Sequence, residues 1–389
     1  LMGSKVVKDI KVDDLAFRVY NPVNWSRSDL VKITIDLKEE DTLKNPIVLD
    51  EEGQEFVCLI NDLGIVFDYT LPKDGFREVK YVHRFEIEVL ISNLEPLGMT
   101  KYKVVDRFIQ SKQESHGLIA ERRLENEYLN VSIESNGSLT VTDKVTGLIY
   151  HDLNTFEDSG DIGNEYMFIA PENDYYWASN DSEPLVECLR QDALMTEYQI
   201  SYNISLPSSC DKEASTREGE VLEGMLLTRV KLSKGQRRID ISTTINNLWE
   251  DHRLRVVMSS GVRTEDHYAH GQYDVITRSN TPWGGWKNPS NCQKQRYFAG
   301  LDDGNQGLMI ANKGLMEYEV VDCSSIVLTL LRSVGELGDW GVFPTSGAQC
   351  LGESTVEYSI IPYLGSWCDS NAYRKAFEFN LETMSAQVM

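Results

Sequence analysis

The stretch 124–168 constrains the fold more than any other part of the chain, because tight turns divide its first half into short runs of alternating polarity. Apolar and polar residues alternate over 129–133 and 139–141, and Asn136-Gly137 lies between the two runs. An Asn-Gly pair in this position is the strongest short-range signal of a β-hairpin, because its turn requires positive φ. A second turn at 144–147 returns the chain to another apolar run. The stretch therefore predicts antiparallel β-structure.

Residues 154–165, by contrast, are acidic and contain glycine without a strand or helix period. We predict a loop here that delivers Tyr166 to the start of the next strand. Phe168 would then lie on the same strand face as Tyr166, since side chains alternate along a strand, and it is assigned to the core.

The rest of the chain divides into two β-rich parts. Residues 12–110 contain alternating runs separated by short turns and predict a small antiparallel β-sandwich. Residues 111–123 are polar and predict a linker, and residues 1–11 are typical of a leader or cloning remnant. Residues 124–389 contain many strand-like runs and one short helical segment at 371–377. This part is too long for an ordinary sandwich, so two large face-to-face sheets and an all-β fold class are predicted.

Composition excludes several classes of function. The formal net charge is −23 over 389 residues, which argues against nucleic-acid and anionic-membrane partners. No apolar run approaches the ~20 residues needed to span a bilayer. The seven cysteines are odd in number and include no Cys-x-x-Cys, so neither a disulfide framework nor a zinc knuckle is predicted. Cysteines without a disulfide pattern are typical of a reducing compartment, so a cytoplasmic protein is predicted.

The sequence offers no catalytic constellation. Glu265-Asp266 and Asp302-Asp303 are adjacent carboxylate pairs, but neighbouring side chains on a strand point to opposite faces and share a site only in a loop. His267 and His270 are the closest pair among six histidines, and their odd spacing on a strand also separates the rings. A zinc site needs three or four convergent ligands. We therefore predict structural roles for these residues, with no catalytic residue and no metal ligand in this chain.

Four segments together resemble a known family. The first is the pattern E-N-x-Y-L-x-V-x-I-x-x-N-G-S-L-x-V-x-D-K-x-T-G from Glu125, followed by G-x-E-Y-x-F from Gly163. The others are 21–29, 246–256 and 345–350. In this order they resemble the C-terminal β-region of the family 38 glycoside hydrolases of bacterial type, which are α-mannosidases. For the larger part, the resemblance implies the supersandwich of the galactose-mutarotase fold.

The resemblance also implies what this chain lacks. Members of the family are retaining α-mannosidases with a metal ion, usually zinc, whose nucleophilic Asp and metal ligands lie in an N-terminal α/β domain. The chain is therefore expected to begin after the catalytic domain. Its large β-region is also compatible with truncation at the C-terminus, because the family continues with further strands. Zinc or another divalent metal is expected in the missing domain. The expected partners are that domain, mannosides and, in a homo-oligomer, further copies of the chain.

The resemblance implies that two places in this chain contact the sugar. The family packs an aromatic residue of the G-x-E-Y-x-F segment against mannose, and Tyr166 occupies that position; a core tyrosine is the alternative. In the family, the loop that matches 333–341 carries an Asp-Arg-Gly element that faces the substrate. This chain has Asp339 and Trp340 before the last glycine of the loop, so the contact that the family's arginine makes is missing. A surface hairpin loop is the alternative there. Trp283 and Trp286 indicate either a carbohydrate platform or a packed turn. Aromatic residues of 154–178 are expected to face the missing domain.

Three classes of function follow. The preferred one is the C-terminal β-region of a metal-dependent retaining α-mannosidase, which supports the missing catalytic domain and lines its sugar site. The second is a free-standing carbohydrate-binding or mutarotase-like protein, and the third is a purely structural assembly domain. The family-like segment 21–29 favours the first class over the second, because mutarotases have no preceding sandwich.

Overall fold

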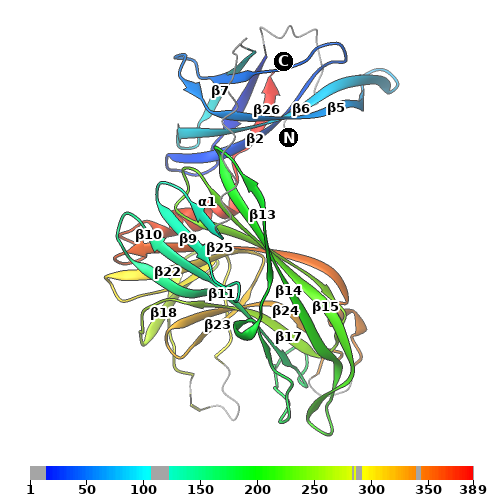
Figure 1. Ribbon diagram of the computed structural model, residues 1–389, viewed down its shortest axis with the longest axis vertical. Helices are drawn as coiled ribbons and strands as arrows, with labels where there is room; N and C mark the ends of the chain where they lie inside the picture. The colour runs from blue at the N-terminus through cyan, green and yellow to red at the C-terminus, as the bar shows by residue number, and fades with distance from the viewer. Residues whose placement is uncertain (1–14, 107–121, 283, 286–290, 339–342, 389) are drawn as a thin grey trace.

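The computed structural model describes residues 15–106, 122–282, 284–285, 291–338 and 343–388. Within them the chain is almost entirely β-structure, with a small sandwich at one end of a much larger one (Figure 1). The predicted all-β fold is therefore confirmed. No helix in these ranges is long and apolar enough to cross a membrane. The sequence predictions that lie outside the described residues concern the leader 1–11, linker residues 111–121, Asp339, Trp340, Trp283 and Trp286.

The small sandwich consists of two antiparallel sheets that share an apolar core. One sheet has the order β26-β1-β7-β3-β4 and the other the order β2-β6-β5. Inward side chains such as Phe17, Ile33 and Phe85 are fully buried between them. The strands are β1 (Ala16–Tyr20), β2 (Arg27–Lys38), β3 (Pro46–Leu49), β4 (Glu55–Phe56), β5 (Cys58–Thr70), β6 (Glu78–Leu94), β7 (Met99–Asp106) and β26 (Met384–Val388).

The C-terminal strand β26 corrects the predicted division of the chain. The sequence predicts one unit from 124 to 389, but β26 pairs with β1 and extends a sheet of the small sandwich. The Gln387 side chain also binds the backbone of Asp36, accepting from its N–H at 3.0 Å and donating to its carbonyl at 3.0 Å. These partners are 351 residues apart in the chain, so no local sequence pattern predicts their pairing.

The larger sandwich is built from two nine-stranded antiparallel sheets that pack face to face, as its length predicts. The first sheet has the order β20-β23-β24-β17-β11-β10-β9-β8, with β12 paired to β11. The second has the order β13-β14-β15-β16-β25-β22-β21-β18-β19. One apolar cluster draws buried side chains from both sheets, among them Val131, Tyr202 and Leu328.

The strands of the first large sheet are β8 (Arg123–Glu125), β9 (Leu129–Ile133), β10 (Leu139–Asp143), β11 (Ile149–Gly160), β12 (Trp177–Ala178), β17 (His252–Ser259), β20 (Gln293–Lys294), β23 (Glu317–Val321) and β24 (Ser325–Ser333). Those of the second are β13 (Leu185–Gln191), β14 (Met195–Asp211), β15 (Thr216–Ser233), β16 (Ile239–Asn247), β18 (Asp266–His270), β19 (Val275–Ser279), β21 (Phe298–Asp302), β22 (Gln306–Lys313) and β25 (Gly352–Leu364).

The predicted hairpin is present as β9 and β10, but the chain after it departs from the prediction. Gly137 takes a φ of 83° in the turn, and a Cβ there would lie 2.1 Å from the Tyr202 hydroxyl. The stretch predicted as a loop is largely strand, because β11 continues to Gly160. Its polar residues Asn154 and Asp158 are buried beside partners distant in sequence, which removes the apolar period from this strand. Tyr166 consequently does not start a strand and lies in the loop after β11.

The predicted helix at 371–377 is confirmed as α1 (Ala372–Asn380). Its residues Ala376 and Phe379 pack with Met309 on the outer face of the second large sheet. From the same helix, Glu378 accepts a 2.9 Å hydrogen bond from the Trp25 indole of the small sandwich. Helix α1 therefore lies between the two sandwiches (Figure 1).

We predict that the small sandwich depends on β26. Gln387→Ala should lower the free energy of unfolding by about 1–3 kcal/mol, because it removes two hydrogen bonds worth roughly 0.5–1.5 kcal/mol each. Deleting residues 384–389 should cost more, because it also exposes the edge of β1. Urea unfolding followed by circular dichroism measures both effects. The control is Met384→Ala, whose side chain is 53% exposed and should change stability by less than about 0.5 kcal/mol. A deletion that unfolds at the wild-type urea concentration would contradict this role of β26.

Candidate functional site

The candidate site is a surface that we call the loop face, formed by residues 161–176 and 334–338. Asn173 bridges to Thr216 at the tip of the β14–β15 hairpin, so the loop face lies at the end of the large sandwich away from the small one (Figure 1). Tyr166 is 65% exposed at this end. The alternative of a core tyrosine is therefore wrong.

Hydrogen bonds within the loop hold Tyr166 in its exposed position. The two sides of the loop pair where the Ile162 N–H donates to the Ile169 carbonyl at 2.8 Å. At the tip, the Asn164 side-chain carbonyl accepts from the backbone N–H groups of Tyr166 and Met167 at 3.0 and 3.1 Å. An Asn side chain that bonds its own backbone two residues on is a turn-forming arrangement. The turn directs the Tyr166 ring outward and provides an acceptor for its backbone N–H.

Two arginines from neighbouring strands fix this loop to the sheet. Arg332 on β24 donates to the Asp161 carboxylate at 2.7 Å and to the Asn164 carbonyl at 2.6 Å. Its cross-strand neighbour on β17, Arg253, places its guanidinium 3.5 Å from the centre of the Phe168 ring. Phe168 is thus half-buried under a cation rather than in the apolar core that the sequence predicts. Sequence reasoning missed both arginines, because each contact joins residues far apart in the chain.

The second loop of the predicted site packs against the first. Glu165 N–H donates to the Glu336 carbonyl at 3.1 Å, and the Glu336 carboxylate lies 3.3 Å from the Lys212 ammonium. Gly338 has a φ of 87°, and a Cβ there would lie 2.3 Å from the Asn164 side chain. The structure therefore brings the Tyr166 loop together with the residues that lead into position 339.

A buried polar network supports the loop face from below. The Asp158 carboxylate binds the His252 ring at 2.6 Å and the Arg217 guanidinium at 2.6 Å. Arg217 also donates to the Tyr175 carbonyl at 2.9 Å, and His252 meets the Asn247 side chain at 2.9 Å. Asp158, Arg217 and His252 are all buried. Removing one member would leave a buried charge or polar group unpaired, at a cost of roughly 3–5 kcal/mol for an ion pair, so the network fixes where β11, β15 and β17 end.

The three tyrosines of 154–178 are exposed, whereas Phe156 is fully buried and Phe168 is half-buried. Tyr175 is 51% and Tyr176 55% exposed, and Tyr176 donates a hydrogen bond to the Glu157 carboxylate. Trp177 differs, because it is half-buried and packs edge-on against Tyr202 in the core. Three tyrosines are thus exposed on the loop face, whereas Trp177 packs against the core.

The Asp302-Asp303 pair and the two neighbouring histidines contact other residues of the fold. Asp302 accepts from Tyr363 and from the Trp367 N–H, both at 3.0 Å, and its neighbour Asp303 closes a turn. His267 is buried between the side-chain amide oxygen of Asn280 and the Tyr318 hydroxyl, each at 2.6 Å. His270 stacks on Tyr297 and Phe298 instead. The odd spacing thus gives the two rings different neighbours.

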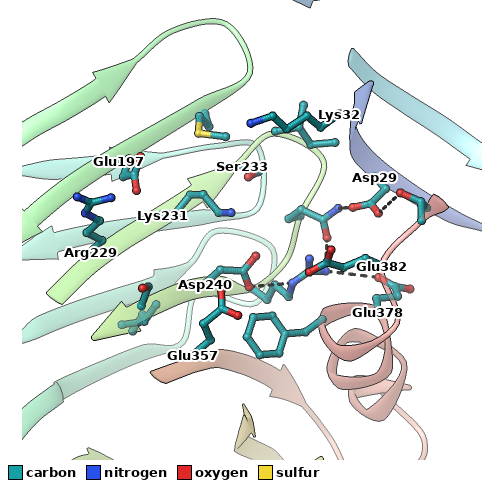
Figure 2. Close-up of a pocket in the computed structure, with 18 of the residues that line it drawn as sticks. Asp29, Lys32, Glu197, Arg229, Lys231, Ser233, Asp240, Glu357, Glu378 and Glu382 are labelled. Atoms are coloured by element: carbon teal, nitrogen blue, oxygen red, sulfur yellow. Dashed lines mark hydrogen bonds and ion pairs between the residues drawn. The ribbon is translucent and has the colours of Figure 1, made fainter. Parts of the chain in front are cut away.

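A cavity of about 410 Å³ lies where the small sandwich meets the large one. Figure 2 shows charged side chains of the large sheet opposite those of β2 and of the α1 segment. Six basic and seven acidic residues line the cavity, and many pair with one another, as do Arg238 with Asp240 at 2.9 Å and Lys313 with Glu382 at 2.7 Å. These charges balance across the junction. We therefore assign the cavity to the junction between the sandwiches and the candidate site to the loop face.

Two family models match this chain. Residues 37–106 match the model described as glycosyl hydrolases family 38 C-terminal domain 1. Residues 124–336 match the model described as the glycosyl hydrolases family 38 C-terminal domain, which by itself covers more than half of the chain. The chain belongs to glycosyl hydrolase family 38.

Relatives of this family 38 chain extend well beyond it. A protein of Halalkalibacterium halodurans with the provisional name of mannosylglycerate hydrolase is 34% identical over 340 residues, which are 83% of this chain and 38% of that protein. The crystal structure of an alpha-mannosidase from Enterococcus faecalis V583 matches with a TM-score of 0.89 and 30% identity, over 96% of this chain and 46% of that one. A second family 38 structure from Enterococcus faecalis matches with a TM-score of 0.85 and 28% identity, over 96% and 47%. The chain spans less than half the length of each relative.

We predict that His267 and His270, two of the buried histidines of this family 38 chain, destabilise it in acid. Burial lowers the pKa of both His267 and His270 below the ordinary value, so the unfolded chain takes up protons at a higher pH than the folded one. The free energy of unfolding should therefore fall as the pH drops below about 6.5, with a slope of at most about 1.4 kcal/mol per pH unit for each proton. Urea unfolding between pH 8 and 5 measures this slope.

The contribution of His267 is isolated by His267→Gln, which removes one titrating ring. This variant should show a shallower loss of stability with acidification than the wild type, whatever its stability at pH 8. His151→Gln is the matched control, because His151 is exposed on β11 and should leave the slope unchanged. Equal slopes for the wild type and His267→Gln would contradict the prediction.

Proposed function

We propose that this chain is the C-terminal β-region of an α-mannosidase and works together with an upstream catalytic domain of the same protein. Support comes from the family 38 matches and from the 30% identity to the alpha-mannosidase of Enterococcus faecalis. The substrates that we propose are terminal α-mannosides, among which the name of the Halalkalibacterium relative singles out mannosylglycerate. The seven cysteines are all free, which supports a reducing bacterial cytoplasm as its location.

In this proposal the loop face forms one wall of the sugar site. The single observation that carries it is the position of Tyr166, which is 65% exposed and held by a turn that two arginines anchor. An exposed phenol ring on a rigid base can cover the C–H face of a sugar and add a hydroxyl hydrogen bond. Asp339 and Trp340 are proposed to extend this wall, because residues 336–338 contact the Tyr166 loop.

The part of the chain that the structure describes offers no set of ligands for the metal ion that the family implies. Among the described residues no group of three or more His, Cys, Asp or Glu side chains is arranged to hold a metal ion. We therefore propose that zinc or another divalent ion binds in the upstream domain, together with the carboxylates of a retaining mechanism. The part assigned to this chain is to bind and orient the sugar and to exclude water from one side of it.

The isolated chain should not hydrolyse an aryl α-mannoside, with or without zinc. Catalytic groups act as a unit, and the loss of one member typically costs several orders of magnitude in rate. Release of nitrophenol from 4-nitrophenyl α-mannoside should equal the buffer blank. Joining the chain to the upstream half of the Enterococcus faecalis alpha-mannosidase, in place of that protein's own C-terminal part, should restore turnover. Zinc-dependent hydrolysis by the chain alone would contradict the proposal and reopen a catalytic role for its own carboxylates.

The role of Tyr166 can be tested in such a joined enzyme. Tyr166→Ala should lower kcat/KM by one to a few orders of magnitude, roughly 1.5–4 kcal/mol of transition-state binding, because it removes both the ring and the hydroxyl. Tyr166→Phe should cost less, because it removes the hydroxyl alone. Neither change should alter the melting temperature much, since the ring is exposed. Steady-state kinetics and thermal unfolding measure the two effects.

Tyr273→Ala is the matched control for this test. Tyr273 is 93% exposed in the turn between β18 and β19 and is not part of the loop face. Its removal should leave kcat/KM unchanged. Wild-type kinetics for Tyr166→Ala would remove Tyr166 from the sugar site, and an equal loss in both variants would point to a general effect of removing surface tyrosines.

A further inference from the structure

The cavity at the junction of the two sandwiches has a floor that the second large sheet builds from cross-strand rows of polar side chains. One row runs from Glu197 on β14 to Lys231 on β15 and Asp240 on β16. The next row includes Ser242 on β16 and its partner Glu357 on β25. Asp240 and Ser242 are two residues apart on one strand, so both rows project from the same outer face of the sheet. All of these residues line the cavity.

The charges on this floor alternate in sign, and some of them are not paired. Lys231 has an acidic cross-strand neighbour on each side, but Asp240 binds Arg238 instead, at 2.9 Å. The half-buried side chains of Glu197, Lys231 and Ser242 form no hydrogen bond or ion pair with any residue that the structure describes. Their donor and acceptor capacity is therefore open to a molecule in the cavity.

The opposite wall of the cavity is formed by the small sandwich and by the segment that follows α1 (Figure 2). Asp29 on this wall is already paired with Arg27 at 2.7 Å. Glu382 is likewise paired with Lys313 at 2.7 Å. Figure 2 shows Lys231 extending from the floor toward this wall. A molecule held by Lys231 would therefore lie between the two sandwiches and contact both.

The size and charge of the cavity limit the class of ligand. Its volume of about 410 Å³ falls within the range of roughly 300–1,000 Å³ that is typical of small-molecule sites. The six basic and seven acidic residues of the lining nearly cancel, so a charged ligand would gain little there and would compete with ion pairs that already exist. Among the described residues, no group of three or more His, Cys, Asp or Glu side chains could hold a metal ion. These properties favour a small polar molecule without net charge.

Hydroxyl groups match a floor on which donors and acceptors alternate, because a hydroxyl both donates and accepts hydrogen bonds. One hydroxyl can donate to the Glu197 carboxylate and accept from the Lys231 ammonium, and a neighbouring hydroxyl can bind Ser242. Hydrogen bonds to ionised groups are about twice as strong as those between neutral groups. A molecule with several adjacent hydroxyls would therefore use the open groups of the floor without bringing a charge into the cavity.

We propose that the junction cavity is a binding site for a neutral polyhydroxylated molecule, a monosaccharide or an open-chain polyol, with Glu197, Lys231 and Ser242 as its partners. Because this molecule contacts both sandwiches, it binds only while they are in contact with each other. The cavity is separate from the loop face, which lies at the other end of the large sandwich. The proposal therefore does not depend on the proposed catalytic role.

Saturation-transfer NMR of the full chain with D-mannose and D-mannitol tests the proposal. At least one of the two should bind saturably with a dissociation constant below about 50 mM, and the tighter one identifies the ligand as a ring or an open chain. D-mannonate is the charged counterpart of D-mannitol. It should bind more weakly than D-mannitol, because its carboxylate would enter a cavity that seven acidic residues already line.

Two variants test whether the ligand lies in the cavity. Lys231→Met should raise the dissociation constant at least about 10-fold, because a hydrogen bond to a charged group is lost. Ser242→Phe fills the cavity from its floor and should abolish binding. Lys73→Met is the matched control, because Lys73 is exposed in the turn between β5 and β6, and it should bind as the wild type does. Thermal unfolding measures whether each variant is folded.

Four results would overturn the proposal. The first is the absence of saturable binding of both neutral compounds up to about 50 mM. The second is wild-type binding in both Lys231→Met and Ser242→Phe, which would place the ligand elsewhere. Loss of binding in Tyr166→Ala together with wild-type binding in Lys231→Met would assign the sugar to the loop face. Tighter binding of D-mannonate than of D-mannitol would replace the neutral ligand by an anion.

Discussion

The apolar layer between the two nine-stranded sheets is the interaction on which the rest of the structure depends. Each large side chain buried in it contributes roughly 1.5–3 kcal/mol relative to exposure to water, and both sheets supply such residues. Trp249 shows how closely the layer is packed. Its indole N–H donates to the Leu206 carbonyl at 3.1 Å, and a Cβ on Gly224 would lie 2.6 Å from its ring. The layer fixes the strand ends, and the strand ends position every loop of the candidate site.

Polar groups take over from apolar packing where the sandwich meets the loop face. Asp158, His252 and Arg217 are buried there and bind one another, because charges removed from water must find partners. Above them, Arg332 and Arg253 attach the Tyr166 loop to two adjacent strands. This arrangement gives an exposed aromatic residue a rigid base, which is what a binding surface requires to align a substrate with groups on another domain.

The two sandwiches are joined by chain connectivity as well as by contacts. The chain begins its described part in the small sandwich, builds the large one, and returns through α1 to place β26 beside β1. At the junction, Arg27 donates to the Leu381 carbonyl at 2.6 Å and pairs with Asp29 at 2.7 Å. Burial raises the pKa of Asp29, and its hydrogen bonds from Arg27 and Thr383 act against this shift. Unfolding the small sandwich would therefore also disrupt the C-terminal segment.

The sequence by itself determined the features that depend on residues a few positions apart. The hairpin turn at Gly137, the alternation of β9 and β10, and helix α1 belong to this group, as does the all-β class. The resemblance singled out Tyr166, but only the tertiary structure decided that its side chain is exposed. The tertiary structure also made a strand of β11, because buried partners far along the chain satisfy Asp158 and Asn154 and hide the apolar period. The same reason applies to β26, since a five-residue edge strand acquires its partner only when residues 351 positions apart meet in the folded chain.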